Sequence, residues 1–127
     1  MTILLAGGTG DLGQRIRQVL GDRPVRVLSR RPVPEAADVV VADVLRDPLD
    51  QAMEGVEVVV SALGASIGLS LGARASFVDV DKAGNLALLR AAERAGVERF
   101  VYVGVHSGPG WGHTRYVQAH ERVSEAL

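Results

Sequence analysis

The chain has 127 residues, of which 47% are hydrophobic, so it is long enough for one domain with a buried core and is not a disordered protein. Its formal net charge of -1 excludes a bulk electrostatic attraction to nucleic acid or to an anionic membrane, and the absence of cysteine excludes disulfides, thiolate metal sites and a cysteine nucleophile. No apolar run reaches the length of a membrane span and no secretion signal precedes the first strand, so we expect a soluble, cytoplasmic protein.

The first predicted element is an apolar strand over residues 3–6, which leads directly into the glycine-rich segment Gly7–Gly13. A strand that turns through glycines into a helix is typical of a phosphate-binding site, because glycine lets an anion approach the backbone and the helix start offers free N–H groups. The spacing Gly-x-x-Gly-x-x-Gly is a weak motif by itself, and an ordinary turn is the alternative. The strand before it and the helix after it favour nucleotide binding.

The helix after the glycines is predicted to end at Gly21, and its apolar face consists of Leu12, Ile16, Val19 and Leu20. Two strands follow, over residues 25–28 and 39–42. The second is β-branched and apolar throughout, as is typical of a parallel strand buried on both faces. The ten residues from Ser29 to Asp38 contain two prolines and are too few for a helical crossover, so we expect an irregular loop there.

The second half of the chain continues the alternation of strands and helices. Asp47-Pro48 predicts the start of a brief helix that ends near Gly55. The remaining elements are a strand over 56–62, a loop over 63–75, a helix over 77–95 with Val80, Ala83, Ala87, Leu88 and Ala91 available for packing, a strand over 100–103, a loop over 106–113 and a last helix over 116–127.

This alternation predicts an α/β fold with a doubly wound parallel sheet of five strands in the order 3-2-1-4-5. A ligand should bind outside the carboxyl ends of the strands, where the segments after Ala6, Leu28, Ala42, Ala62 and Val103 meet. The chain ends within a helix, just where a sixth strand is expected. We therefore expect residues 1–127 to be a nucleotide-binding domain truncated before that strand and lacking a C-terminal substrate part; a minimal natural domain is the alternative.

The end of the second strand bears on the choice between NAD and NADP. An acidic residue that binds the ribose would stand about 20 residues after the glycines, but this chain has Ser29-Arg30-Arg31 there. Arginine offers a planar fork suited to a 2′-phosphate, which a carboxylate would repel. The sequence favours NADP over NAD, with two solvated surface arginines as the alternative.

Two further segments follow strands at the expected binding edge. Asp43-Val44 follows the third strand, and Asp43 would either accept a hydrogen bond from an adenine amino group or cap a turn. The segment Ser61-Ala62-Leu63-Gly64 stands at the end of the fourth strand. Its small residues would let the backbone approach the middle of the cofactor, although small residues are also common in tight turns.

Four segments together resemble the atypical short-chain dehydrogenase/reductase superfamily, with the closest resemblance to its NmrA-like, NAD(P)H-binding branch. They are Ala6–Gly13, Val27–Arg30, Asp79–Leu86 and Arg99–Val103. The resemblance implies a Rossmann-like fold that binds NAD(P)H. For the individual positions it implies that the pyrophosphate contacts Gly7, Gly10 and Gly13, with Thr9 and Leu12 beside it. It also implies that Arg30 binds the 2′-phosphate, that Asp43 and Val44 lie near adenine, and that Ala62 and Leu63 lie near the nicotinamide ribose. We expect the neighbouring Asp11, Ser29, Arg31 and Gly64 to belong to the same cofactor-binding site.

The chain departs from this family at the catalytic residues. Active members use a serine after the fifth strand and a Tyr-x-x-x-Lys pair on the next helix. Here Tyr116 matches the tyrosine, but His120 replaces the lysine, and the serine position falls at Gly104 or Val105. Histidine is mostly uncharged near neutral pH and activates a tyrosine more weakly. A catalytic role for Tyr116 and a half-buried aromatic without one are equally supported.

The leading hypothesis is an oxidoreductase that transfers hydride from NADPH to a small carbonyl or quinone-like acceptor, with Tyr116 as proton donor and His120 as its partner. The alternative is a non-catalytic NADP(H) sensor that acts through a protein partner. A nucleotide-sugar epimerase or dehydratase would need the complete tyrosine–lysine pair. We expect no metal site, because no carboxylate or cysteine completes a ligand set with the three histidines. By analogy alone, the helices over 77–95 and 116–127 would form the face of a homodimer.

Overall fold

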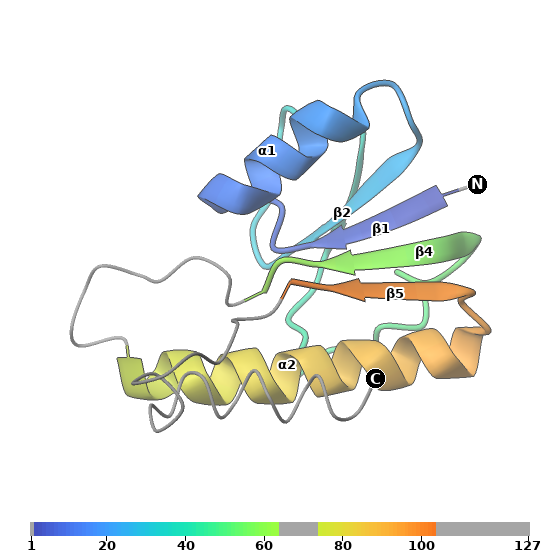
Figure 1. Cartoon of the computed structure of the whole chain (residues 1–127). Helices are drawn as coiled ribbons and strands as arrows, with labels where there is room; N and C mark the ends of the chain where they lie inside the picture. Colours follow the sequence, from blue (N-terminus) through green and yellow to red (C-terminus); the bar gives the residue numbers. More distant parts are fainter. Residues whose placement is uncertain (1, 64–73, 104–127) are drawn as a thin grey trace, which may run out of the picture.

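The computed structural model describes residues 2–63 and 74–103, and the side chains of the second range from residue 83 onward. The strands in this part form a single five-stranded sheet in the order β3-β2-β1-β4-β5, and every pairing is parallel (Figure 1). The strands are β1 (Thr2–Ala6), β2 (Val25–Ser29), β3 (Asp38–Val41), β4 (Val56–Ser61) and β5 (Arg99–Tyr102). The predicted Rossmann-like strand order is confirmed.

Two helices cover opposite faces of this sheet, α1 (Asp11–Leu20) on one side and α2 (Arg74–Ala95) on the other (Figure 1). Each ends where the sequence predicts, because Gly21 and Gly96 adopt the positive φ angles of +58° and +73° that glycine tolerates best. Among the described residues, no helix combines the length and apolar character needed to cross a membrane. The cytoplasmic location stays a prediction.

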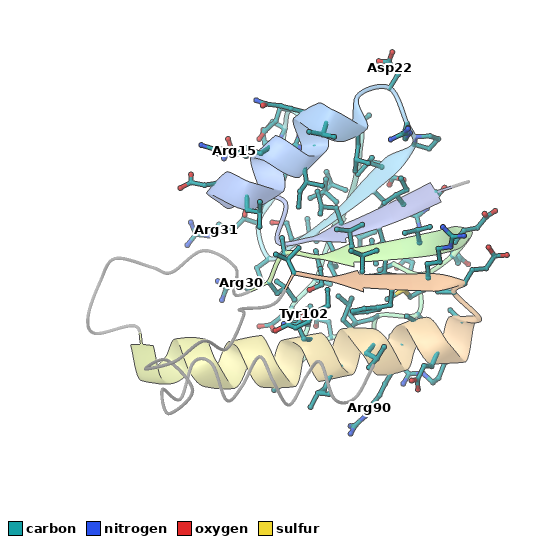
Figure 2. The ribbon with its side chains drawn as sticks, viewed as in Figure 1. Arg15, Asp22, Arg30, Arg31, Arg90 and Tyr102 are labelled. Atoms are coloured by element: carbon teal, nitrogen blue, oxygen red, sulfur yellow. The ribbon has the colours of Figure 1, made fainter. Side chains whose placement is uncertain are left out.

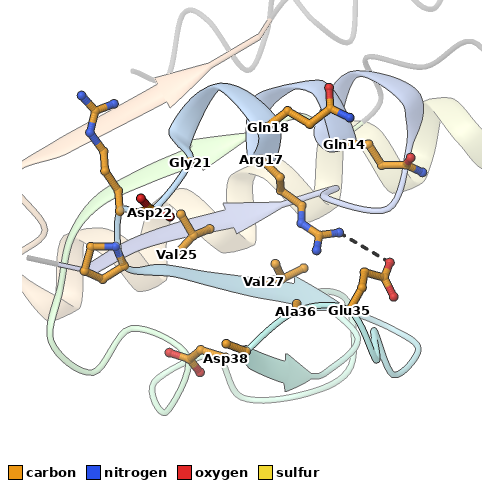
Figure 3. Close-up of a pocket in the computed structure, with 13 residues that line it drawn as sticks. Gln14, Arg17, Gln18, Gly21, Asp22, Val25, Val27, Glu35, Ala36 and Asp38 are labelled. Carbon is orange, nitrogen blue, oxygen red and sulfur yellow. Dashed lines mark ion pairs between the residues drawn. The ribbon is translucent and has the colours of Figure 1, made fainter.

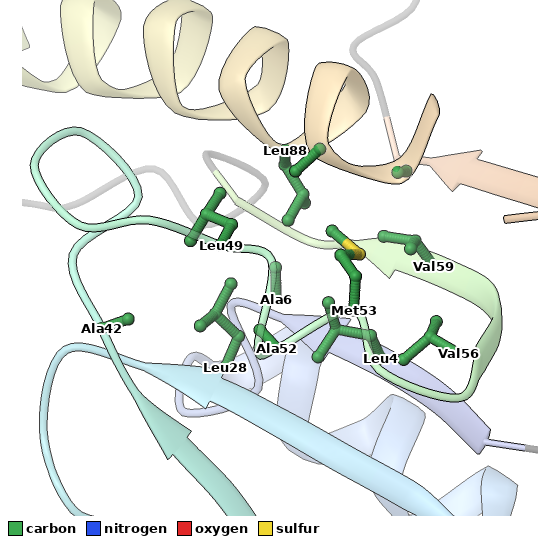
Figure 4. Packing of buried hydrophobic residues seen from close by; sticks show 12 residues of the cluster. Leu4, Ala6, Leu28, Ala42, Leu49, Ala52, Met53, Val56, Val59 and Leu88 are labelled. Carbon is green, nitrogen blue, oxygen red and sulfur yellow. The ribbon is translucent and has the colours of Figure 1, made fainter. Parts of the chain in front are cut away.

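The main core lies between the sheet and α2 (Figure 4). Leu4 and Val59 from the central strands and Leu88 from α2 are completely buried. Side chains from the segment before β4, notably Leu49 and Met53, complete the cluster. Because α2 packs directly over the central strands, residues on its buried face can reach the turns that follow those strands.

The packing face of α1 differs in part from the prediction. Gly13 is its buried residue, Leu12, Ile16 and Leu20 are half-buried, and Val19 is 80% exposed. The close contact of Gly13 with the preceding turn orients the helix, and Val19 lies to one side of the resulting face. Likewise, Ala83 of α2 is exposed rather than packed.

The expectation that the third strand is buried on both faces is wrong. β3 lies at the sheet edge, and Val41 is 54% exposed. The connection over residues 30–37 is irregular, as predicted, so it places no helix over β3.

The predicted helix from Asp47 to Gly55 is also wrong, because this segment forms a series of turns. The Asp47 carboxylate accepts a hydrogen bond from the backbone N–H of Asp43, at 2.7 Å, instead of capping the residues that follow. Arg26 of β2 secures the end of this segment by donating to the carbonyl oxygens of Ala52 (2.9 Å) and Glu54 (2.7 Å). The turns bring the apolar side chains of Leu49, Ala52 and Met53 into the core.

Candidate functional site

The carboxyl ends of the strands lie level with one another. In the strand register, Ala6 of β1 pairs with Leu28 of β2 and with Ser61 of β4. The backbone N–H of Ala62 donates to the Ala6 carbonyl at 2.9 Å, and that of Ala42 donates to the Ser29 carbonyl at 2.9 Å. The turns after β1, β2, β3 and β4 therefore lie along one edge of the sheet, as predicted.

The turn after β1 passes very close to the turn after β4. Gly7 has a φ of +80°, a left-handed conformation that favours glycine. A Cβ at Gly7 would lie 2.8 Å from the carbonyl carbon of Ala62 and 3.0 Å from the backbone nitrogen of Leu63. Only a residue without a side chain allows these two backbones to approach so closely.

The start of α1 packs directly on the same turn. A Cβ at Gly13 would lie 2.0 Å from the Gly7 carbonyl oxygen and 2.6 Å from the Gly8 Cα. Gly8 is constrained as well, because its Cβ would lie 3.1 Å from Cγ1 of Val27. Gly8 was not among the predicted site residues, since its contact with Val27 exists only in the folded chain.

The first turn of α1 is open to an anion. Gly10 is the N-cap residue and provides no side-chain cap, while Gln14 donates to the Thr9 carbonyl at 3.0 Å. Thr9 and Asp11 are exposed, and Leu12 is half-buried. The N–H groups of this turn are uncapped and lie at the positive end of the helix dipole. They stand beside glycines whose positions have no room for a side chain. This arrangement fits the diphosphate of a dinucleotide.

The segment after β2 presents two arginines at this edge (Figure 2). The Ser29 hydroxyl accepts a hydrogen bond from the backbone N–H of Arg31 at 3.1 Å, which turns the chain after the strand. Arg30 and Arg31 are exposed, and neither forms an ion pair within the part of the chain that the structure describes. Their charges are available to a ligand.

The turn after β3 is closed by its own aspartate. The Asp43 carboxylate accepts a hydrogen bond from the backbone N–H of Leu45 at 2.9 Å. Val44 packs against α2, where a Cβ at Gly84 would lie only 2.9 Å from its Cγ2. Asp43 thus caps a turn, one of the two roles considered, and its contact with adenine stays a prediction.

The turn after β4 is tied to α2 by a buried amide. Ser61 and Asn85 are both completely buried, and the Ser61 hydroxyl donates to Oδ1 of Asn85. Nδ2 of Asn85 donates to the Leu63 carbonyl at 3.4 Å. Asn85 was not among the predicted site residues, although an amide three residues before the fully buried Leu88 is an unusual choice for an apolar helix face.

Several predicted residues lie outside the described ranges. They are Gly64 of the turn after β4, the catalytic candidates Tyr116 and His120, and the other two histidines, His106 and His113. Their roles stay predictions.

A groove of about 680 Å³ lies between α1 and β2, and one of its lining residues, Gln14, is hydrogen-bonded to Thr9 of the glycine turn (Figure 3). It runs between α1 and the loop before β3, and an ion pair of 3.6 Å between Arg17 and Glu35 spans it. The groove exists because the connection from β2 to β3 contains no helix that would cover this part of the sheet.

Comparison with known proteins agrees with this geometry. The family model described as NAD(P)H-binding matches residues 7–125. The chain is 32% identical over 114 residues to the photosystem II assembly factor Ycf39 of Synechocystis, covering 83% of this chain and 34% of that protein.

Solved structures support the same fold. A short-chain dehydrogenase/reductase superfamily protein from Agrobacterium tumefaciens, with bound NAD, is 26% identical with a TM-score of 0.77, covering 98% of this chain and 43% of that one. UDP-glucose 4-epimerase from Thermotoga maritima is 20% identical with a TM-score of 0.77, covering 100% of this chain and 50% of that one, and shows the fold alone. The chain thus spans between a third and a half of the length of these proteins. It belongs to the NAD(P)H-binding family of the short-chain dehydrogenase/reductase superfamily.

Proposed function

We propose that this chain is the NADP(H)-binding domain of an atypical short-chain oxidoreductase that transfers hydride to a small carbonyl or quinone-like acceptor. The observation that carries the proposal is the glycine turn. Gly7 and Gly13 cannot carry a Cβ without displacing backbone atoms, and the first turn of α1 has no side-chain cap. An ordinary connection between a strand and a helix needs neither feature, whereas a diphosphate needs both.

The preference for NADP over NAD rests on charge at the end of β2. Arg30 and Arg31 are exposed there and, within the described residues, unpaired, and no acidic residue occupies positions 29–31. The nearest carboxylate along the loop, Glu35, pairs with Arg17 across the groove. NAD is the alternative, because the Agrobacterium relative has NAD bound.

In this proposal the nicotinamide cofactor supplies the hydride, and the chain binds and orients it. The glycine turn would hold the diphosphate, Arg30 the 2′-phosphate, and the backbone at Ala62 and Leu63 would approach the nicotinamide ribose. Tyr116 would donate the proton to the reduced carbonyl, with His120 as its partner. This chain matches between a third and a half of the length of its relatives. Residues that correspond to the unmatched part of those relatives would complete the substrate pocket.

A non-catalytic NADP(H) sensor is the second candidate. It is supported by His120 in the place of the family's lysine and by the relative Ycf39, whose name describes an assembly factor. Such a protein would bind the cofactor through the same glycine turn and act on a protein partner. NADPH oxidation with a panel of quinones and aldehydes separates the two: turnover that Tyr116→Phe abolishes supports the enzyme, and intact binding without turnover supports the sensor.

Cofactor choice is tested by titrating the chain with NADPH and NADH and repeating both titrations with Arg30→Ala. Loss of a charge-assisted hydrogen bond should weaken NADPH binding by about tenfold or more and leave NADH binding unchanged. Arg90→Ala, an exposed arginine on α2, is the matched control (Figure 2). Equal losses for both cofactors would refute the role of Arg30, and a wild-type chain that binds neither would refute the proposed function.

A further inference from the structure

Two consecutive residues of α2 contact two different turns at the candidate site. Gly84 faces Val44 in the turn after β3, and Asn85 contacts Ser61 and Leu63 around the turn after β4. We propose that Asn85 is a positioning residue that holds the Ala62–Leu63 peptide in place at the nicotinamide end of the nucleotide site. This inference rests on the proposed function.

The first argument is the cost of burying an amide. Asn85 has no exposed surface and lies on the face of α2 that also contributes Leu88 and Ala91 to the core. A leucine there would fill similar space without polar groups to satisfy, since an amide is tolerated in a core only when it is hydrogen-bonded. Its hydrogen bonds to Ser61 and Leu63 lie on either side of Ala62. The amide thus defines where β4 ends and how the chain leaves it.

The same short segment, from Ser61 to Leu63, is also in contact with the glycine turn. The backbone N–H of Ala62 donates to the Ala6 carbonyl at 2.9 Å, and a Cβ on Gly7 would lie 3.0 Å from the Leu63 nitrogen. The Ala62–Leu63 peptide therefore lies against Gly7, and the groups on either side of it are bonded to Asn85. The glycine turn and Asn85 together restrict how this segment can move.

Gly84 and Asn85, although adjacent on α2, act on different turns of the candidate site. If the cofactor's diphosphate lies on the glycine turn, the turns after β3 and β4 flank its two halves, as the order β3-β2-β1-β4-β5 requires. A Cβ at Gly84 would press on Val44 of the adenine-side turn at 2.9 Å and meet Leu63 only at an ordinary contact distance of 3.8 Å. Asn85 bonds to the nicotinamide-side turn. Replacing each residue should therefore affect a different half of the same ligand.

The test compares NADPH with adenosine 2′,5′-bisphosphate, which contains the adenine half and the 2′-phosphate but no nicotinamide. Calorimetric titrations are run with the wild-type chain, Asn85→Leu, Ser61→Ala and Gly84→Ala. We expect Asn85→Leu to weaken NADPH binding about three- to tenfold, the worth of one or two hydrogen bonds, and to leave bisphosphate binding unchanged. Ser61→Ala should act in the same direction with a smaller effect. Gly84→Ala, whose Cβ would press on Val44, should weaken both ligands by the same factor.

A purely structural role for Asn85 would weaken both ligands equally, and that result, or no change in either, would overturn the inference. Ser61→Ala removes only one hydroxyl and keeps the test valid if Asn85→Leu folds poorly. Amide hydrogen exchange of the ligand-free chain adds an independent measurement, in which exchange at Ala62 should accelerate in Asn85→Leu and not in Gly84→Ala. A wild-type chain that binds neither ligand would instead refute the proposed function, and this inference with it.

Discussion

Gly13→Ala tests the central geometric claim, that α1 starts in direct contact with the turn after β1. The new Cβ would lie 2.0 Å from the Gly7 carbonyl oxygen and 2.6 Å from the Gly8 Cα. Ordinary van der Waals contact starts at 3.4 Å, so the helix must move away by about 1.4 Å, because both neighbours are backbone atoms that cannot rotate aside. Alanine gains about 1 kcal/mol of helix propensity over glycine, which is less than overpacking of this kind costs.

We expect Gly13→Ala to lower the free energy of unfolding by about 1–3 kcal/mol and to weaken NADPH binding at least about tenfold, since the N–H groups of α1 move with the helix. Urea denaturation and a fluorescence titration measure the two effects. Gly21→Ala is the matched control at the other end of α1. Its Cβ meets nothing within 4 Å, but its φ of +58° is unfavourable for alanine, so stability should fall by about 1–2 kcal/mol with binding unchanged. Wild-type stability and binding in Gly13→Ala would refute the contact geometry.

Three further substitutions probe the fold around the site, each measured by urea denaturation. Arg26→Met removes the hydrogen bonds to two backbone carbonyls and the 3.1 Å ion pair with Asp38. It should lower the free energy of unfolding by about 1–3 kcal/mol and leave NADPH binding unchanged. A loss of NADPH binding would contradict a purely structural role for Arg26. Leu88→Ala leaves a cavity at a completely buried position and should lower the free energy of unfolding by about 2–5 kcal/mol. A decrease below about 1 kcal/mol would show that α2 does not pack on the sheet through Leu88. Asp43→Ala removes the oxygen that accepts from the Leu45 N–H and should lower the free energy of unfolding by about 1 kcal/mol. Asp43→Asn keeps an acceptor oxygen there, so its effect should be much smaller.

Local sequence signals were sufficient to predict the strands, which coincide with apolar runs, and the ends of the helices, which are marked by glycine. The five strands fall within one or two residues of their predicted bounds, and the helices end at Gly21 and Gly96. The sheet order also followed from sequence, because alternating strands and helices with right-handed crossovers allow few topologies. The same reasoning placed the glycine turn and the segment after β2 at one edge of the sheet, which the strand register confirms.

The wrong predictions arise where local preference competes with packing. Proline after Asp47 permits a helix to begin there, but the segment before β4 instead forms turns that bury Leu49 and Met53 against the sheet. The apolar β3 suggested burial on both faces, yet burial depends on what covers a strand. An edge position next to a loop without a helix leaves Val41 exposed.

By itself, the sequence determined the glycine turn and the arginines that follow β2, because each depends on residues close together in the chain. It also determined the order of the sheet, because alternating strands and helices allow few topologies. Only the tertiary structure decided which distant residues meet at the carboxyl edge of the sheet. Gly8 meets Val27, Gly84 meets Val44, and Asn85 bonds to Leu63. These pairs lie 19 to 40 residues apart, and no local pattern encodes them. The pairing of β1 with β2 brings Gly8 to Val27, and the packing of α2 on the sheet creates the other two contacts.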